Sequence, residues 1–169
     1  MPGTTPGALV PIYLRLQSPD RHFDKPEPPP QANQVSVHFE ACPYPRRTLR
    51  LITESGMKAG LAFNPKTQIP DLAFCLPYLS FIVILTTEPE IPDSPFLPAV
   101  LEKIKEGKTR PEFGNIEWIA DGGISAENTE LVAKAGADML VVGRGIFKEG
   151  AISDNILEII SAVGFPKDK

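Results

Sequence analysis

The chain has 169 residues, of which 17 are Lys or Arg and 21 are Asp or Glu, so its formal net charge is −4. That length suits one domain able to bury roughly 70% of the surface that its unfolded chain exposes. No apolar run approaches the ~18 residues of a membrane span, and no run of Lys and Arg offers a surface to nucleic acid or anionic lipid. We therefore expect neither a membrane nor a nucleic acid as partner.

Proline dominates the first part of the chain. Residues 1–8 are expected to form a flexible tail, and the apolar stretch at 9–14 is a candidate strand. The run PEPPP at 26–30 cannot be helical, because each proline ring removes a backbone donor and clashes with the preceding turn. Residues 24–33 are therefore predicted to be an extended linker, inside a single domain that we place at 9–165.

From residue 35 onward, strand and helix patterns alternate. The predicted strands are 35–39, 58–63, 81–85, 116–120 and 139–142, the last of them buried. The predicted helices are 45–55, 70–79, 95–106, 125–135 and 152–163. The strand starts are 23, 23, 35 and 23 residues apart, a spacing typical of repeated strand–helix units that build a parallel sheet with helices outside.

Counting the stretch at 9–14, the sequence predicts six strand–helix units, about two fewer than a full barrel holds. The predicted class is α/β: an incomplete barrel of the (β/α)₈ TIM type, with about six parallel strands and outer helices. The two cysteines, Cys42 and Cys75, stand in neither a CxxC motif nor a metal-ligand spacing, so we expect reduced thiols. With no signal-peptide pattern at the start, this favours a cytoplasmic protein.

Ligands of parallel α/β proteins bind beyond the carboxyl ends of the strands. The residues at those positions are His38, Glu40, Asn64, 86–88, 121–123 and 143–145. Gly122 and Gly123 come before one predicted helix, and Gly143 follows the next strand. Such glycines let backbone N–H groups approach an anion closely, so we predict a phosphate site there, with Arg144 adding a charge-assisted bond. The alternative is two tight turns without a ligand and an arginine on the barrel rim.

Asp121 ends an apolar strand, where a lone carboxylate is costly unless it is paired or solvated in a cleft. This position favours a catalytic or ligand-binding role, with capping of the following helix as the alternative. His38 is a candidate for the substrate pocket, although a histidine at a strand end is as often a satisfied structural residue.

Several of these motifs together resemble the ribulose-phosphate 3-epimerase family. The matching segments are VHFEA at 37–41, GMKAG at 56–60, NPKT at 64–67, DGGI at 121–124 and AGAD at 135–138. Their order and spacing follow the family over roughly residues 9–163, and the segment at 13–21 resembles the family's third strand and the turn after it.

The resemblance implies an isomerase of carbohydrate metabolism, in the pentose phosphate pathway, that interconverts ribulose 5-phosphate and xylulose 5-phosphate through an enediolate. Two aspartates on opposite faces exchange the proton, and a divalent metal (zinc, iron or manganese) stabilises the enediolate oxygens. By this resemblance, Asp121 is both a metal ligand and one of the acid/base pair. Gly122, Gly123 and Gly143 match the phosphate-binding turns.

The sequence also departs from the family. The first two strand–helix units, which would supply a His and an Asp to the metal, have no counterpart, and that Asp is the second acid/base residue. Tyr13 stands where the metal-binding His of the third strand is expected. Three of the four implied metal ligands are thus missing. The loop after the family's sixth strand has lost its glycines, and Arg144 replaces a small polar residue.

Two hypotheses follow. The chain is either an epimerase-family enzyme with impaired catalysis or an inactive phosphate-binding barrel remnant that works by binding or interaction. The orotidine-phosphate decarboxylase superfamily ranks below both: VVGRGI at 141–146 would place an arginine on the phosphate, but the Asp-x-Lys strand of that group is absent near 9–20.

An incomplete barrel leaves two sheet edges open. We expect these edges to expose Ile12, Leu14 and Val35, and to be covered by homo-oligomerisation or by a partner chain. The expected small-molecule partner is a sugar-phosphate substrate.

Overall fold

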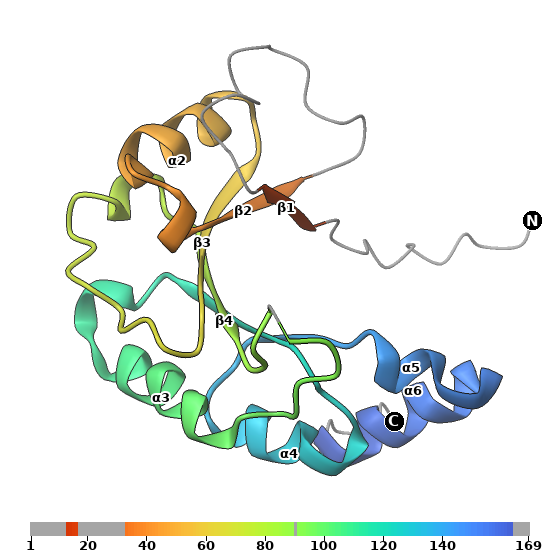
Figure 1. The fold of residues 1–169 in the computed structure, drawn as a ribbon. Helices are drawn as coiled ribbons and strands as arrows, with labels where there is room; N and C mark the ends of the chain where they lie inside the picture. The colour runs from red at the N-terminus through yellow and green to blue at the C-terminus, as the bar shows by residue number, and fades with distance from the viewer. Residues whose placement is uncertain (1–12, 17–32, 90, 164–169) are drawn as a thin grey trace, which may run out of the picture.

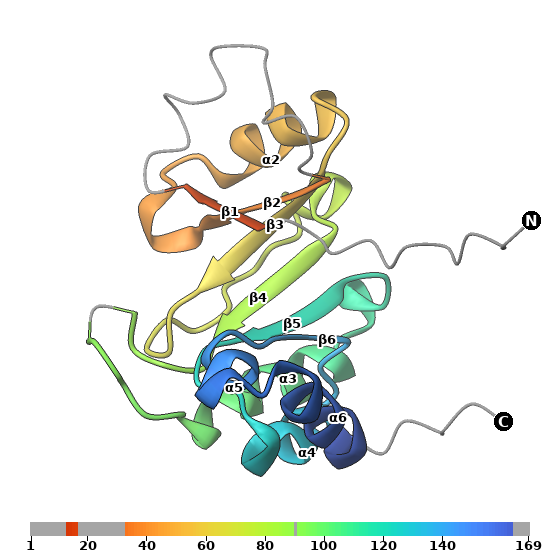
Figure 2. The ribbon, with the colours of Figure 1, turned by 90° about the vertical axis from the view of Figure 1, so that its right-hand side faces the viewer.

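The computed structural model describes residues 13–16, 33–89 and 91–163. Six strands lie in chain order in one sheet, and each pairs in parallel with the next (Figure 1, Figure 2). They are β1 (Tyr13–Leu16), β2 (Gln34–His38), β3 (Lys58–Phe63), β4 (Phe81–Leu85), β5 (Glu117–Asp121) and β6 (Met139–Val141). The helices are α2 (Pro45–Glu54), α3 (Glu102–Thr109), α4 (Ala126–Lys134), α5 (Arg144–Phe147) and α6 (Ile152–Val163).

The sheet curves into an open arc, with the helices along its outer, convex side (Figure 1). Within the described residues, β1 pairs only with β2 and β6 only with β5, so these two strands form the edges. The predicted α/β class, with six parallel strands and outer helices in an incomplete barrel, is confirmed. Among the described helices, none combines the length and the apolar character needed to cross a membrane.

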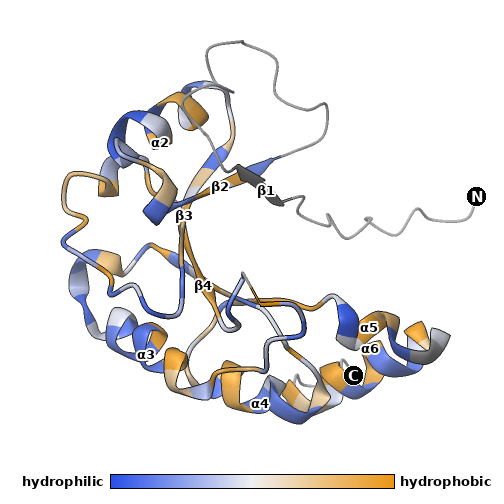
Figure 3. Cartoon of the chain, in the orientation of Figure 1, coloured by the Kyte–Doolittle hydropathy of each residue, from blue (hydrophilic) through white to orange (hydrophobic). Residues whose placement is uncertain are grey.

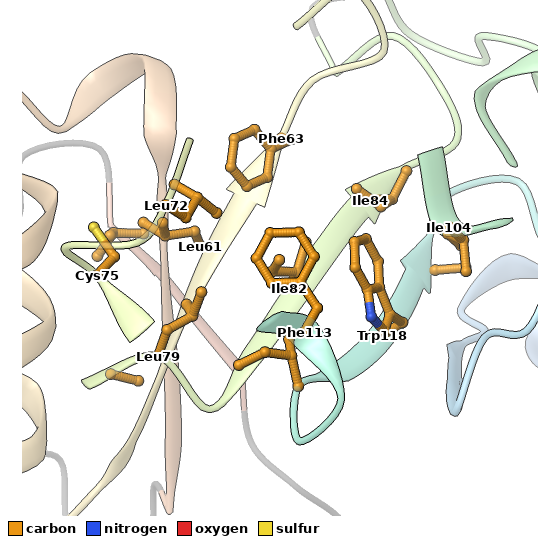
Figure 4. Packing of buried hydrophobic residues seen from close by; sticks show 14 of the residues in the cluster. Leu61, Phe63, Leu72, Cys75, Leu79, Ile82, Ile84, Ile104, Phe113 and Trp118 are labelled. Atoms are coloured by element: carbon orange, nitrogen blue, oxygen red, sulfur yellow. The ribbon is translucent and has the colours of Figure 1, made fainter. Parts of the chain in front are cut away.

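The main core lies between the sheet and the outer helices (Figure 4). Trp118 of β5 is fully buried, and its ring meets Phe113 edge-on with the centroids 5.8 Å apart. Gly107 of α3 makes room for it, since a Cβ atom there would lie 2.0 Å from the indole ring. The absence of one side chain thus lets α3 pack closely against β5.

A second, smaller cluster lines the concave face of the sheet. Alternate residues of a strand point to opposite faces, so the two clusters draw on interleaved positions of the same strands. The concave cluster consists of Ala62, Phe81, Val83, Leu85 and Ile119, all of them buried.

The expectation that Val35 is exposed at an open edge is wrong. Val35 is only 1% exposed, because its side chain lies on the face of the sheet that the outer helices cover. There it belongs to the same cluster as Leu49 and Ile52 of α2. Ile12 and the side chain of Leu14 lie outside the described part of the chain.

Two predicted helices differ from the structure, and proline explains both differences. Residues 70–79 form only turns and a short 3₁₀ helix at Leu76–Tyr78, because Pro77 has no N–H to donate and the Asp71 carboxylate accepts the Ala73 N–H at 2.9 Å instead. The helix expected at 95–106 starts as a 3₁₀ turn at Pro98–Leu101 and becomes α-helical only from Glu102.

Three smaller outcomes complete the comparison with the sequence. The strand predicted at 139–142 forms as β6, but its three residues are half-buried rather than buried, because the strand is at an edge. The short helix α5 was not predicted. The tail at 1–8 and nearly all of the linker at 24–33 lie outside the described residues, and the candidate strand at 9–14 enters them only at Tyr13, the first residue of β1.

Candidate functional site

The carboxyl ends of β5 and β6 form one side of a cleft of about 540 Å³. Asp121 and Val141 are paired in the register of these two strands, which brings the two following turns side by side. The residues lining the cleft are Thr87, Asp121, Gly122, Gly123, Ile124, Ser125, Val141, Gly143, Arg144, Gly145 and Lys148. The structure therefore gathers in one place Asp121 and every residue of the predicted phosphate site.

The turn after β5 requires its two glycines. Gly122 has a φ of 123° and Gly123 a φ of 63°, both in the region that L side chains rarely adopt. A Cβ atom would also lie 2.5 Å from the hydroxyl of Thr87 at Gly122, and 2.9 Å from its methyl group at Gly123. The backbone of this turn is consequently open toward the cleft, with no side chain of its own in the way.

Two polar side chains outside the predicted site hold this turn in place. Thr86 is fully buried; its backbone N–H donates to the Asp121 carbonyl at 2.8 Å and its hydroxyl to the Gly122 carbonyl at 2.5 Å. From the other side, the Asn128 amide donates to the Gly123 carbonyl at 2.9 Å and accepts the Ser125 N–H at 3.0 Å. Ser125 thus starts α4 as predicted, and the same cap fixes the site.

The cleft is basic at its outer rim. Arg144 begins α5, lies exposed and forms an ion pair with Asp93. Lys148 also lines the cleft and was missed by sequence reasoning, although its place four residues after Arg144 puts the two on one face of a helical turn. Asp121, half-buried at the end of β5, is the one carboxylate among the described residues that line the cleft.

His38 does not line this cleft. It ends β2, three strands away from Asp121, which corresponds to about 14 Å along the sheet at ~4.8 Å per strand. Its Nδ1 lies 3.5 Å from the Glu40 carboxylate. The role of His38 in a substrate pocket stays a prediction, and the structure places it in a separate polar cluster.

That cluster organises the loop after β3. The Glu40 carboxylate accepts the Asn64 N–H at 2.8 Å. Lys103 of α3 is 8% exposed and donates to the carbonyls of Asn64, Pro65 and Thr67 at 2.7 to 2.9 Å. All three donor positions of the ammonium are used in this way, which ties the NPKT segment to the outer helix layer.

Glu40 carries a lowered pKa. Partial burial acts to raise it, but hydrogen bonds from the Thr67 side chain and from backbone N–H groups, helped by His38, bring the pKa of this carboxyl below its ordinary value of 4.5. The charged carboxylate is therefore preferred in the folded chain.

From this we predict a pH-dependent contribution to stability. A carboxyl group whose pKa is lower in the folded chain than in the unfolded chain stabilises the fold at pH values above the unfolded pKa. This stabilisation is lost as the pH falls through the folded pKa. Glu40→Gln should reduce the free energy of unfolding at about pH 7, by less than about 1 kcal/mol because solvent screens the group, and should have less effect at about pH 3. Urea titrations at both pH values measure this. Glu54→Gln, on the exposed face of α2, is the control, and an equal loss from Glu40→Gln at both pH values would contradict the prediction.

The family metal implied by the sequence does not find a ligand set here. Among the residues that the structure describes, no three His, Cys, Asp or Glu side chains come close enough together to hold a metal ion. Asp121 lines the cleft without a second carboxylate or an imidazole beside it in the lining. The described residues therefore do not fit a metal centre of several protein ligands.

Comparison with known proteins identifies the family of this chain. The model of the ribulose-phosphate 3 epimerase family matches residues 6–147. The chain belongs to this family. The ribulose-phosphate 3-epimerase of Bacillus subtilis is 35% identical over 154 residues, a match covering 88% of this chain and 69% of that protein. The Escherichia coli K12 protein of the same name is 38% identical over 120 residues, covering 70% of this chain and 53% of that protein.

The ribulose-phosphate 3-epimerase family member described here thus spans about half to two thirds of the length of these relatives. Solved structures show the fold. A tryptophan synthase complex from Pyrococcus furiosus matches with a TM-score of 0.60 at 16% identity, over 94% of this chain and 68% of that one. A 3-hexulose-6-phosphate synthase matches with a TM-score of 0.53 at 14% identity, over 78% and 62%.

Proposed function

We propose that this chain binds a ketopentose phosphate in the cleft at the ends of β5 and β6, with ribulose 5-phosphate as the first candidate. The observation that carries the proposal is the single cleft that joins one carboxylate, two glycine turns and two basic side chains. Membership of the ribulose-phosphate 3-epimerase family supports this class of substrate.

In this proposal the phosphate binds against the backbone of the turns at Gly122-Gly123 and Gly143, where N–H groups are accessible and the start of α4 adds a favourable dipole. Arg144 and Lys148 supply the countercharge. The bound phosphate then fixes the distance of the sugar carbons from Asp121. From this position, the Asp121 carboxylate takes or returns the proton at C3 on one face of the sugar.

Epimerisation needs one group that removes a proton on one face of the sugar and a second group that returns a proton on the opposite face. We infer that the chain alone catalyses the reaction weakly, because Asp121 is the one carboxylate that the described part of the chain places in the cleft lining. The same observation favours a second candidate function, a binding or interaction protein that holds a sugar phosphate without turning it over. Measuring binding and turnover separately distinguishes the two.

Arg144→Gln should weaken the binding of ribulose 5-phosphate about tenfold, since a charge-assisted hydrogen bond to phosphate is lost. Isothermal calorimetry measures this directly. The matched control is Arg50→Gln, which removes an exposed, ion-paired arginine from α2, far along the chain from the cleft. Equal affinities for the Arg144 variant and the wild type would place the phosphate elsewhere.

Gly123→Val should abolish the binding, because a Cβ atom there would lie 2.9 Å from the Thr87 methyl group and 3.4 Å from Phe96, so that the turn has to move. The φ of 63° also resists any L residue, so circular dichroism must first show that the variant folds. Undiminished calorimetric binding by a folded Gly123→Val protein would contradict the proposed site.

A further inference from the structure

The outer rim of the proposed phosphate site carries an ion pair within the chain. Arg144 lines the cleft, and its Nη1 atom donates to the carboxylate of Asp93, a residue of the loop after β4 that does not line the cleft. Figure 3 shows hydrophilic colour at the start of α5, where Arg144 is the first residue. The cation expected to bind a phosphate thus already holds an anion of this chain.

This ion pair is easily broken. Arg144 is 68% exposed and Asp93 is 87% exposed, so water screens the attraction between them. The contact joins one guanidinium nitrogen to one carboxylate oxygen, whereas a carboxylate that fixes a guanidinium firmly is typically bidentate. A phosphate group carries about −1.5 to −2 charges at neutral pH and can therefore displace the single charge of Asp93.

The loop that carries Asp93 is held by other contacts. The buried Ser94 hydroxyl accepts the Glu88 N–H at 3.0 Å, and the Leu97 N–H donates to the Thr86 carbonyl at 2.8 Å. Because these bonds do not involve the ion pair, loss of the pair should leave the backbone of the loop in place. The pair then acts chiefly on the charge that Arg144 offers to a ligand.

The charge balance of the cleft depends on this pair. The charged side chains that line the cleft are Arg144, Lys148 and Asp121, which sum to +1. When the carboxylate of Asp93 is added, the sum is zero. A phosphate dianion is attracted by the first arrangement and much less by the second.

We propose that Asp93 competes with the ligand phosphate for Arg144 and so sets the affinity of the cleft. This inference rests on the proposed phosphate site. While the cleft is empty, the Asp93 carboxylate holds the guanidinium at the rim. A bound phosphate takes over the guanidinium, and the carboxylate of Asp93 is released to solvent.

Calorimetry on Asp93→Asn tests the proposal. Asp93 has a φ of 55°, which asparagine also tolerates, so the variant removes the charge and keeps the backbone. We expect Asp93→Asn to bind both ribulose 5-phosphate and inorganic phosphate about threefold more tightly than the wild type, with a smaller gain at high salt. The matched control is Glu54→Gln, which removes a carboxylate from another exposed pair with an arginine and should leave both affinities unchanged.

The same substitution in an Arg144→Gln background shows whether Asp93 acts through Arg144. There we expect Asp93→Asn to change the affinity little, because the group for which Asp93 competes is gone. An equal gain in both backgrounds would overturn the proposal, since Asp93 would then act only through its general field. Unchanged or weaker binding by Asp93→Asn alone would also overturn it, and weaker binding would show that Asp93 positions Arg144 for the phosphate.

The two ligands separate this inference from the proposed function. If inorganic phosphate shows the expected pattern and ribulose 5-phosphate does not bind, the role of Asp93 is supported and the proposed substrate is wrong. If ribulose 5-phosphate binds equally to the wild type and to Asp93→Asn, the substrate is supported and the role of Asp93 is overturned. Binding of neither ligand to either protein would overturn both.

Discussion

With ribulose 5-phosphate as substrate, the chain alone should turn over at least about 10²-fold more slowly than the Bacillus subtilis relative. One correctly placed acid or base is typically worth about 10²–10⁴ in rate, and the family reaction uses two. Within residues 13–16, 33–89 and 91–163, Asp121 is the one carboxylate that lines this cleft. A coupled assay that detects xylulose 5-phosphate measures the rate for both proteins under the same conditions.

Asp121→Asn should remove the activity that remains, since the amide cannot accept the C3 proton at neutral pH. Asp154→Asn, an exposed position on α6, is the matched control and should change nothing. The prediction of impaired catalysis would be wrong if the chain turned over about as fast as the Bacillus subtilis relative and lost this activity on Asp121→Asn. It would mean that other groups, on this chain or on a partner, complete the site.

The second large effect concerns stability. Trp118→Ala should lower the free energy of unfolding by about 3–5 kcal/mol, because it empties the space beneath Gly107 and beside Phe113. Chemical denaturation followed by far-UV circular dichroism measures the loss.

Trp118→Phe provides the comparison. The indole N–H is buried and has no hydrogen-bond partner among the described residues, so phenylalanine removes this unpaired donor while keeping most of the ring contacts. Its cost should be much smaller than that of alanine. A phenylalanine variant as unstable as the alanine variant would show that the packing of the full indole, rather than the filled volume, decides the stability.

Most of the fold follows from local sequence patterns. The strands at 58–63 and 81–85 form over the predicted residues. FIVIL at 81–85 is a continuous apolar run, as expected of a strand covered on both faces, and KAGLAF at 58–63 is buried from Ala59 to Phe63. The errors in the two helices at 70–79 and 95–106 involve proline. Pro77 lacks the N–H that a helix over 70–79 would use, and Pro98 disfavours the α region for the residue before it, so no helix begins at 95.

Local sequence patterns already predicted which residues of the candidate site would lie together. Glycine pairs after two neighbouring strands and an aspartate at a strand end are local features, and the repeat of strand–helix units already predicts that they meet at one edge of a sheet. For the same reason, Asp121 and the residues of the predicted phosphate site line one cleft in the structure.

The surroundings of these residues depend on contacts between distant segments. Thr86 and Asn128 hold the glycine turn from separate segments, and Lys148, directly after α5, also lines the cleft. Such contacts depend on the path of each loop between strand and helix, and the periodic pattern of the sequence does not predict that path. The same holds for Val35: strand alternation places it on one of two faces, but packing against α2 makes that face the buried one.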